Sequence, residues 1–183
     1  MPNTALRLIL SAFLMLSLVG GVSLFSTFKV AYAAESKLGK VTGLPIPRFV
    51  TLRSSKVNAR TGPALRYPIQ WVYKRDNLPV EVTAEFDAWR QIRDMDGSIS
   101  WVHSSLLSGQ RMGLIHNIDG EMETAPAYKK ADSQSRRVLA LENAALGEIK
   151  KCDMRYCQLD FKAYRGWVEK KYIWGIYPDE VIE

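Results

Sequence analysis

The chain has 183 residues, of which 47% are hydrophobic, and it carries 25 basic and 19 acidic side chains. Arg7 and Lys29 are the charged residues of the first 33 positions, so the rest of the chain has 23 basic and 19 acidic residues. This mild excess fits ordinary solubilising charge, and it also fits attraction to an anionic surface polymer or to lipid headgroups. It forms no concentrated basic stripe, which excludes nucleic acid as the expected partner.

Residues 1–33 predict a signal peptide. Arg7 precedes an uncharged run over residues 8–28, and Ala31-Tyr32-Ala33 places small residues where a signal peptidase reads them. We expect cleavage after Ala33, which gives a periplasmic or secreted protein without stable membrane insertion. The alternative is an uncleaved helix that anchors the chain in the inner membrane, because about 20 apolar residues are enough to span a bilayer.

Residues 34–47 are rich in Gly, Pro and Lys and show no periodicity, which predicts a flexible lead-in. Short runs with period-two alternation follow and predict half-buried strands. These runs are Phe49–Leu52, Lys56–Ala59, Ile69–Tyr73, Pro79–Ala84, Trp89–Arg93 and Ile99–Val102. Before the last run, Asp96-Gly97 is a hairpin signal, because both residues tolerate positive φ. Short strands at close spacing predict a small β-barrel.

A second series of strands is predicted after residue 110. Its runs are Gly113–Ile118, Arg137–Leu141, Ala144–Lys151, Tyr156–Phe161 and Tyr164–Val168. Turn-prone residues at 117–120 and at Ala125-Pro126 argue against a long helix in the segment between the two series. Alanine and leucine are frequent in residues 135–148, so a helix is the alternative there, although Gly147 weakens it.

A Trp-Val strand ending occurs twice, at Trp101-Val102 and at Trp167-Val168, 66 residues apart. A spacing of this size indicates a repeated structural unit, so we predict an all-β protein with two tandem modules, residues 48–109 and 110–180. Further matches pair Trp89 with Tyr156, Ile92 with Leu159, Val80 with Leu146, and Val82 with Glu148, or with Ile149 if one residue is inserted. In modules this small we expect Trp101 and Trp167 to fill the cores.

The first module resembles a bacterial SH3-like (SH3b) domain. The residues that carry the resemblance are Val57 to Pro63, Tyr67 to Ile69, Leu78 to Val82, Ala88 to Ile92 and Trp101 to Leu107. The ending Trp174 to Glu180 is similar to the tail of exported two-module SH3-like proteins of alphaproteobacteria. The resemblance implies two tandem small SH3-like β-barrels after the signal peptide. The second module lacks the Asn-x-Arg-x-Gly-Pro turn, which makes a groove built from that turn doubtful there.

Cys152 and Cys157 are the only cysteines, and they flank a predicted hairpin turn. In an oxidising compartment this spacing favours a disulfide across the turn. The alternatives are a catalytic thiolate and a zinc site. A thiolate lacks a supporting histidine, because His103 and His116 are the only histidines and neither adjoins a cysteine in sequence. Two cysteines at this spacing with two scattered histidines do not make a tetrahedral zinc site.

No cofactor, metal site or catalytic set is expected, because the sequence has no phosphate-binding loop, no serine-nucleophile motif and no carboxylate pair at a suitable spacing. The remaining functional candidates are aromatic. We predict a ligand groove in the first module, formed by Asn58, Arg60, Tyr67, Trp71 and Tyr73.

The expected function is non-enzymatic binding of a cell-envelope ligand, either a peptidoglycan peptide or an envelope protein. One alternative is a scaffold in which the two barrels pack on each other or on a partner. The other is a remote relative of cell-wall peptidases, which would need a free reactive cysteine.

Overall fold

The computed structural model describes residues 37–116 and 123–183. These residues form predominantly strands, with two short 3-10 helices, which confirms the all-β prediction. The predicted signal peptide lies outside the described residues. Within them, no helix has the length and apolar character that crossing a membrane requires.

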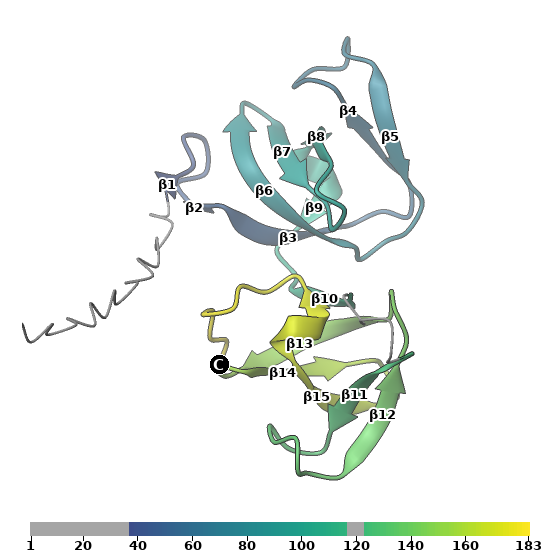
Figure 1. Ribbon diagram of the computed structural model, residues 1–183. Coiled ribbons are helices and arrows are strands. Elements are labelled where there is room, and N and C mark those ends of the chain that lie inside the picture. The colour runs from purple at the N-terminus through teal and green to yellow at the C-terminus, as the bar shows by residue number, and fades with distance from the viewer. Residues whose placement is uncertain (1–36, 117–122) are drawn as a thin grey trace, which may run out of the picture. The chain divides into compact units, whose positions relative to one another are not determined.

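The first large sheet has seven strands and spans the blue to teal part of the chain in Figure 1. Its strands are β3 (Arg48–Leu52), β4 (Val57–Arg60), β5 (Ile69–Tyr73), β6 (Pro79–Phe86), β7 (Trp89–Arg93), β8 (Ile99–His103) and β9 (Leu107–Ser108), with the 3-10 helix η1 (Ser104–Leu106) before β9. The strands are paired in the order β5-β4-β8-β7-β6-β3-β9. The predicted turn at Asp96-Gly97 joins β7 to β8, and Gly97 has a φ of 82°.

The second large sheet also has seven strands and continues from teal through green to yellow. Its strands are β10 (Met112–Ile115), β11 (Ala125–Tyr128), β12 (Arg137–Leu141), β13 (Leu146–Cys152), β14 (Tyr156–Asp160), β15 (Arg165–Glu169) and β16 (Ile173–Trp174), with the 3-10 helix η2 (Lys170–Tyr172) before β16. The order is β12-β11-β15-β14-β13-β10-β16, so each strand corresponds to the strand seven places earlier in the chain. The pairings leave both sheets open, so closure into barrels is not confirmed.

The strand registers of the two sheets agree residue by residue. Trp101 lies opposite Arg60, and Trp167 lies opposite Tyr128 at the corresponding position. Irregularities recur at corresponding places, between Val82 and Ala84 in one sheet and between Ile149 and Lys151 in the other. Val82 therefore corresponds to Ile149, the alternative that required one inserted residue, whereas the match of Val80 with Leu146 was wrong, because Val80 occupies the position of Gly147.

The two repeated tryptophans do not fill the cores, contrary to the prediction. Trp101 and Trp167 are half-buried, whereas the neighbouring Val102 and Val168 are fully buried. Side chains alternate between the faces of a strand, so each valine takes the core side and its tryptophan takes the opposite side. The cores instead consist mainly of small and branched side chains, including Leu52, Val57, Val82 and Ile92 in the first sheet, and each contains one tyrosine.

Three strands of the two large sheets were missed in the sequence, namely β9, β11 and β16. The helical alternative for residues 135–148 was wrong. Ala125–Tyr128 forms β11, although Pro126 indicated a turn. β11 is aligned with β12 over its whole length but with β15 at Tyr128, so the missing N–H of Pro126 removes little of the ladder. Residues 135–148 contribute to β12 and β13.

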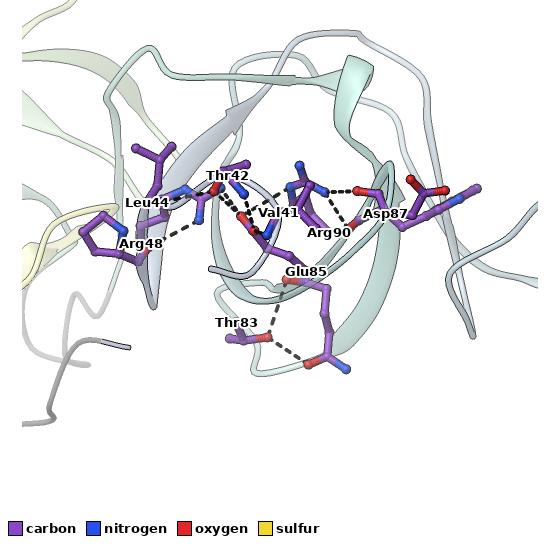
Figure 2. Close-up of polar contacts among 11 residues, drawn as sticks. Val41, Thr42, Leu44, Arg48, Thr83, Glu85, Asp87 and Arg90 are labelled. Atoms are coloured by element: carbon purple, nitrogen blue, oxygen red, sulfur yellow. Dashed lines mark hydrogen bonds and ion pairs between the residues drawn. The ribbon is translucent and has the colours of Figure 1, made fainter. Parts of the chain in front are cut away.

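Residues 37–46 form a small hairpin, so the predicted flexible lead-in was wrong for this part. β1 (Lys37–Leu38) pairs with β2 (Pro45–Ile46). The Glu85 carboxylate holds the hairpin by accepting hydrogen bonds from the backbone N–H groups of Val41 and Thr42, both at 3.0 Å, and from the Thr42 hydroxyl at 2.6 Å (Figure 2). This anchor lies more than 40 residues downstream, beyond the reach of a local sequence pattern.

Glu85 also binds two arginines from its own sheet. Its Oε1 atom lies 2.9 Å from Arg48 and 3.6 Å from Arg90, and its side chain has no exposed surface. Burial alone would raise the pKa of Glu85, but the hydrogen bonds from Thr42, Arg48 and Val41 outweigh it and lower the pKa to about 2.

The same hairpin is stabilised by different cross-strand pairs in the two sheets. Glu85 lies opposite Arg90 at the end of β6 and β7, and Cys152 lies opposite Cys157 at the corresponding position in β13 and β14. The cysteines form the predicted disulfide, with α-carbons 4.1 Å apart. In each sheet a further segment of the chain binds to this pair. The N-terminal hairpin binds Glu85, and Ile182 exchanges backbone hydrogen bonds with Cys152.

Acid should weaken the fold through Glu85. Because its pKa is lowered on folding, the stabilisation is complete above the usual value of 4.5 and is lost as pH falls towards 2. We expect a loss of about 2 kcal/mol in the free energy of unfolding, which is less than the full shift would give, because the hairpin that covers the carboxylate is itself exposed to solvent. Urea unfolding between pH 2 and 7 measures it. Glu85→Gln should lack this part of the pH dependence, and Glu142→Gln, at an exposed position, should keep it; equal profiles for wild type and Glu85→Gln would contradict the assignment.

Replacing both cysteines by alanine should lower the free energy of unfolding by about 2 kcal/mol, the chain-entropy value for a loop this short. The measurement is urea unfolding with and without dithiothreitol. Reductant should shift the wild-type midpoint and leave the double variant unchanged. A wild-type midpoint that ignores complete reduction, verified by thiol titration, would show that the disulfide does not stabilise the fold.

Candidate ligand-binding surfaces

Three of the five predicted groove residues divide between the two faces of the β4–β5 hairpin. Directly opposed residues of an antiparallel pair share a face. Trp71 lies opposite Ala59 and Tyr73 lies opposite Val57, both of which are core residues, whereas Asn58 lies opposite Val72 on the other face. The structure thus groups Trp71 with Tyr73 and separates them from Asn58.

Arg60 and Tyr67 lie together and shape the turn after β4. The Arg60 guanidinium donates a hydrogen bond of 2.7 Å to the Tyr67 carbonyl oxygen. The Tyr67 ring lies against Gly62, where an added Cβ would come within 2.6 Å of it, and the Arg66 guanidinium lies 5.1 Å from the ring centroid. The Asn-x-Arg-x-Gly-Pro segment therefore owes its glycine to the close approach of a tyrosine.

Trp71 and Tyr73 line a hollow of about 160 Å³. Its other lining residues are Leu78, Pro79, Val80, Asp94, Met95, Asp96 and Leu114. Trp71 is 59% exposed, whereas Tyr73 is buried, with 6.5 Å between their ring centroids. An exposed indole beside a small apolar hollow is an arrangement suited to ligand contact.

A buried polar pair forms one wall of this hollow. The Tyr73 hydroxyl donates to Asp94 Oδ2 at 2.9 Å, and Asp94 Oδ1 accepts from the backbone N–H groups of Asp96 at 3.1 Å and Ser98 at 2.8 Å. Burial, followed by the charge of Asp94, raises the pKa of Tyr73 well above its usual value. Tyr73 thus remains protonated and holds the β7–β8 turn beside Trp71.

The second sheet has hydrophobic side chains at the corresponding positions. The strand registers place Leu139 where Trp71 stands, Leu141 where Tyr73 stands and Phe161 where Asp94 stands. Leu141 belongs to the core, and Leu139 and Phe161 pack against it. The aromatic and acidic lining is therefore specific to the first sheet.

The second sheet has two hollows of its own beside the disulfide-closed turn. One of about 440 Å³ lies between residues 131–133 and 153–156, and one of about 360 Å³ is lined by Met154, Arg155, residues 169–171, Ile173, Ile176 and Pro178. Met154 is 67% exposed, and the Arg155 guanidinium lies 5.6 Å from the Tyr156 ring centroid. A hollow surface thus exists where the sequence made a groove doubtful, and its residues show no motif that would have identified it.

The C-terminal segment joins the two sheets through an apolar and a polar contact. Phe49 packs against Trp174 and Tyr177, with ring centroids 5.0 and 4.8 Å away. The Trp174 indole donates to the Pro79 carbonyl oxygen at 3.0 Å, and the Tyr177 hydroxyl donates to Glu81 at 2.8 Å. Burial and this bond raise the pKa of Tyr177. The segment Trp174 to Glu180, selected in the sequence for its resemblance to the tail of SH3-like proteins, therefore has a structural role here.

The residues considered for catalysis have structural roles. His103 Nδ1 accepts a hydrogen bond from the Ser105 backbone N–H at 3.3 Å, and its ring packs edge-on against Trp89 with centroids 5.5 Å apart. His103 therefore caps η1. Both cysteines are paired. Among residues 37–116 and 123–183, no three His, Cys, Asp or Glu side chains are grouped so that they could hold a metal ion.

Residues 53–109 match the bacterial SH3 domain family. No curated protein sequence matches the chain. The structures of NlpC2 and NlpC1 from Trichomonas vaginalis are similar to it at 11% and 12% sequence identity, over 70% and 74% of this chain, with TM-scores of 0.31 and 0.32. The chain spans 48% of the length of each.

Replacing Tyr177 by phenylalanine should destabilise the protein by about 1–2 kcal/mol, because the buried Glu81 carboxylate loses a hydrogen bond. Glu81 is 1% exposed and would keep its ion pair with Arg93. Urea unfolding measures the change, and Tyr164→Phe, at a tyrosine that is 64% exposed, is the matched control. Equal midpoints for the two variants would contradict a stabilising role of the Tyr177–Glu81 bond.

Proposed function

We propose that the protein is a non-enzymatic, exported binding protein that recognises a cell-envelope ligand, either a peptidoglycan peptide or an envelope protein. Bacterial SH3 domains commonly bind cell-wall components, and residues 53–109 match that family. The observation that carries the proposal is the exposed Trp71 of this segment, which lines a hollow formed by residues between 71 and 96 together with Leu114 of β10.

The proposal includes two SH3-like modules, residues 48–109 and 110–180, after a signal peptide over residues 1–33. Support for the second module comes from the repeated strand order and from strand irregularities at corresponding positions. Support for export comes from the N-terminal sequence and from a disulfide, which persists in an oxidising compartment. The periplasm or the extracellular medium is the location that these features favour.

The exposed aromatic surface favours a binding role for the first module. Trp71 and Ile69 are 59% and 47% exposed on β5, which is the first strand in the order of its sheet. An edge strand offers unpaired backbone groups to an extended peptide, and neighbouring apolar side chains add contact area. A peptide from the envelope is therefore the form of ligand that this edge suits.

A scaffold is the second candidate, favoured by the contacts that join the two sheets. Phe49, Trp174 and Tyr177 form an aromatic cluster, and the Tyr177 hydroxyl reaches Glu81 of the first sheet. Such contacts would hold two modules rigidly for a partner. In this case the exposed Trp71 surface would contribute nothing to envelope binding, which distinguishes the two functions.

Purified peptidoglycan should retain the full chain more strongly than an unrelated protein of equal charge. Trp71→Ala should reduce this retention severalfold, because it removes the exposed ring that contacts the ligand, whereas Tyr164→Ala should not. Sedimentation of peptidoglycan and quantification of bound protein measure the effect. The binding proposal would be overturned by two results together: retention on peptidoglycan equal to that of the unrelated protein, and a pull-down from envelope extract in which the wild type captures no protein that Trp71→Ala fails to capture.

A further inference from the structure

We infer that the hollow beside Trp71 recognises a side chain that ends in a primary ammonium group on an apolar stem, as in lysine and other diamino acids. This inference rests on the proposed function and names the ligand chemistry of the same surface. It follows from the lining of the hollow, from the unused acidic group at its rim and from the comparison of the two sheets.

The lining suits an aliphatic stem. Leu78 supplies apolar surface above the buried Pro79, Val80 and Leu114, and the volume of about 160 Å³ accommodates a single side chain rather than a larger ligand. Trp71 contributes an indole that is 59% exposed. A methylene chain can pack on this surface while its ammonium group stays near the rim, as lysine side chains do on apolar surfaces.

The charge of the lining selects a cation. Asp94 and Asp96 are its ionisable acidic residues, and the lining contains no lysine, arginine or histidine. Asp94 is committed, because its two oxygens accept bonds from Tyr73, Asp96 and Ser98. The exposed Asp96 carboxylate has no side-chain partner among residues 37–116 and 123–183, so it can receive an ammonium group. The indole face adds cation–π attraction.

The fold does not require this lining. The second sheet has the same strand order and replaces Trp71, Tyr73 and Asp94 by Leu139, Leu141 and Phe161. Those three side chains pack into or against an apolar core. A buried Tyr–Asp pair carries a desolvation cost that an apolar core avoids. The first sheet nevertheless has this pair, which holds the acidic turn beside Trp71. Because stability does not require the pair, we infer that it serves ligand recognition.

The test is a titration of the full chain with three blocked tripeptides, Ala-Lys-Ala, Ala-norleucine-Ala and Ala-acetyllysine-Ala, followed by calorimetry and by NMR of the Trp71 indole. The lysine peptide should bind about fivefold more tightly than either neutral peptide, the size expected for an exposed ion pair. Asp96→Asn should remove this preference and leave the binding of the norleucine peptide unchanged.

Asp87→Asn is the matched control, because Asp87 is also an exposed turn aspartate of the first sheet but does not line the hollow. It should preserve the preference for lysine. Equal affinities for all three peptides, or a preference that survives in Asp96→Asn, would overturn the ammonium inference. Peptidoglycan retention that depends on Trp71 would then still support the proposed function, whereas loss of both would remove the function as well.

Discussion

The buried carboxylate of Glu81 is the interaction on which the arrangement of the two sheets depends. It is 1% exposed and is shared by Arg93 of its own sheet and Tyr177 of the C-terminal segment. A buried charge is stable only when its partners are in place, so this carboxylate ties the C-terminal segment to β6. The same segment places Trp174 on Pro79, which lines the hollow beside Trp71. The candidate binding surface is thus supported by residues about 100 positions away in the sequence.

The two sheets show how one strand order carries different chemistry. Glu85 and Arg90 occupy positions that Cys152 and Cys157 occupy in the other sheet. An ion pair that also receives hydrogen bonds from a separate segment depends on that segment and on pH, whereas a disulfide depends on neither. The first sheet has the pH-dependent ion pair and a hollow with polar lining. The second sheet has the disulfide, and its residues at the positions that correspond to that lining are apolar.

Local pattern was sufficient to predict most strands, because alternation and turn residues act within a few positions. Ile69–Tyr73, Trp89–Arg93 and Arg137–Leu141 were predicted with their observed bounds. Errors arose where a distant partner decides the outcome. The hairpin of residues 37–46 depends on Glu85, and β11 tolerates Pro126 because its neighbours supply the ladder. The error at Trp101 has a different, local cause: the prediction relied on the small size of the module, but the alternation of β8 gives the core position to Val102.

The same limit applies to the candidate site. Trp71 and Tyr73 could be selected from the sequence because they are aromatic residues of a predicted strand. Asp94 could not, because its hydrogen bond with Tyr73 spans 21 positions of the chain. The predicted set mixed two faces, because Asn58 and Trp71 are separated by the pleat of the hairpin rather than by their distance in the sequence. Asp94 and Phe161 are found to be equivalent only when the two sheets are aligned by their strand pairing rather than by a constant spacing in the sequence.

The segment that matches the bacterial SH3 family begins at Arg53, immediately after β3. β3 supplies Val50 and Leu52 to the core and Phe49 to the contacts with Trp174 and Tyr177, and the hairpin that covers Glu85 lies further upstream. A recombinant fragment cut to the family boundaries would therefore lose an internal strand of its sheet and the cover of a buried carboxylate. We therefore expect the smallest fragment that folds alone to be larger than the segment that matches the family.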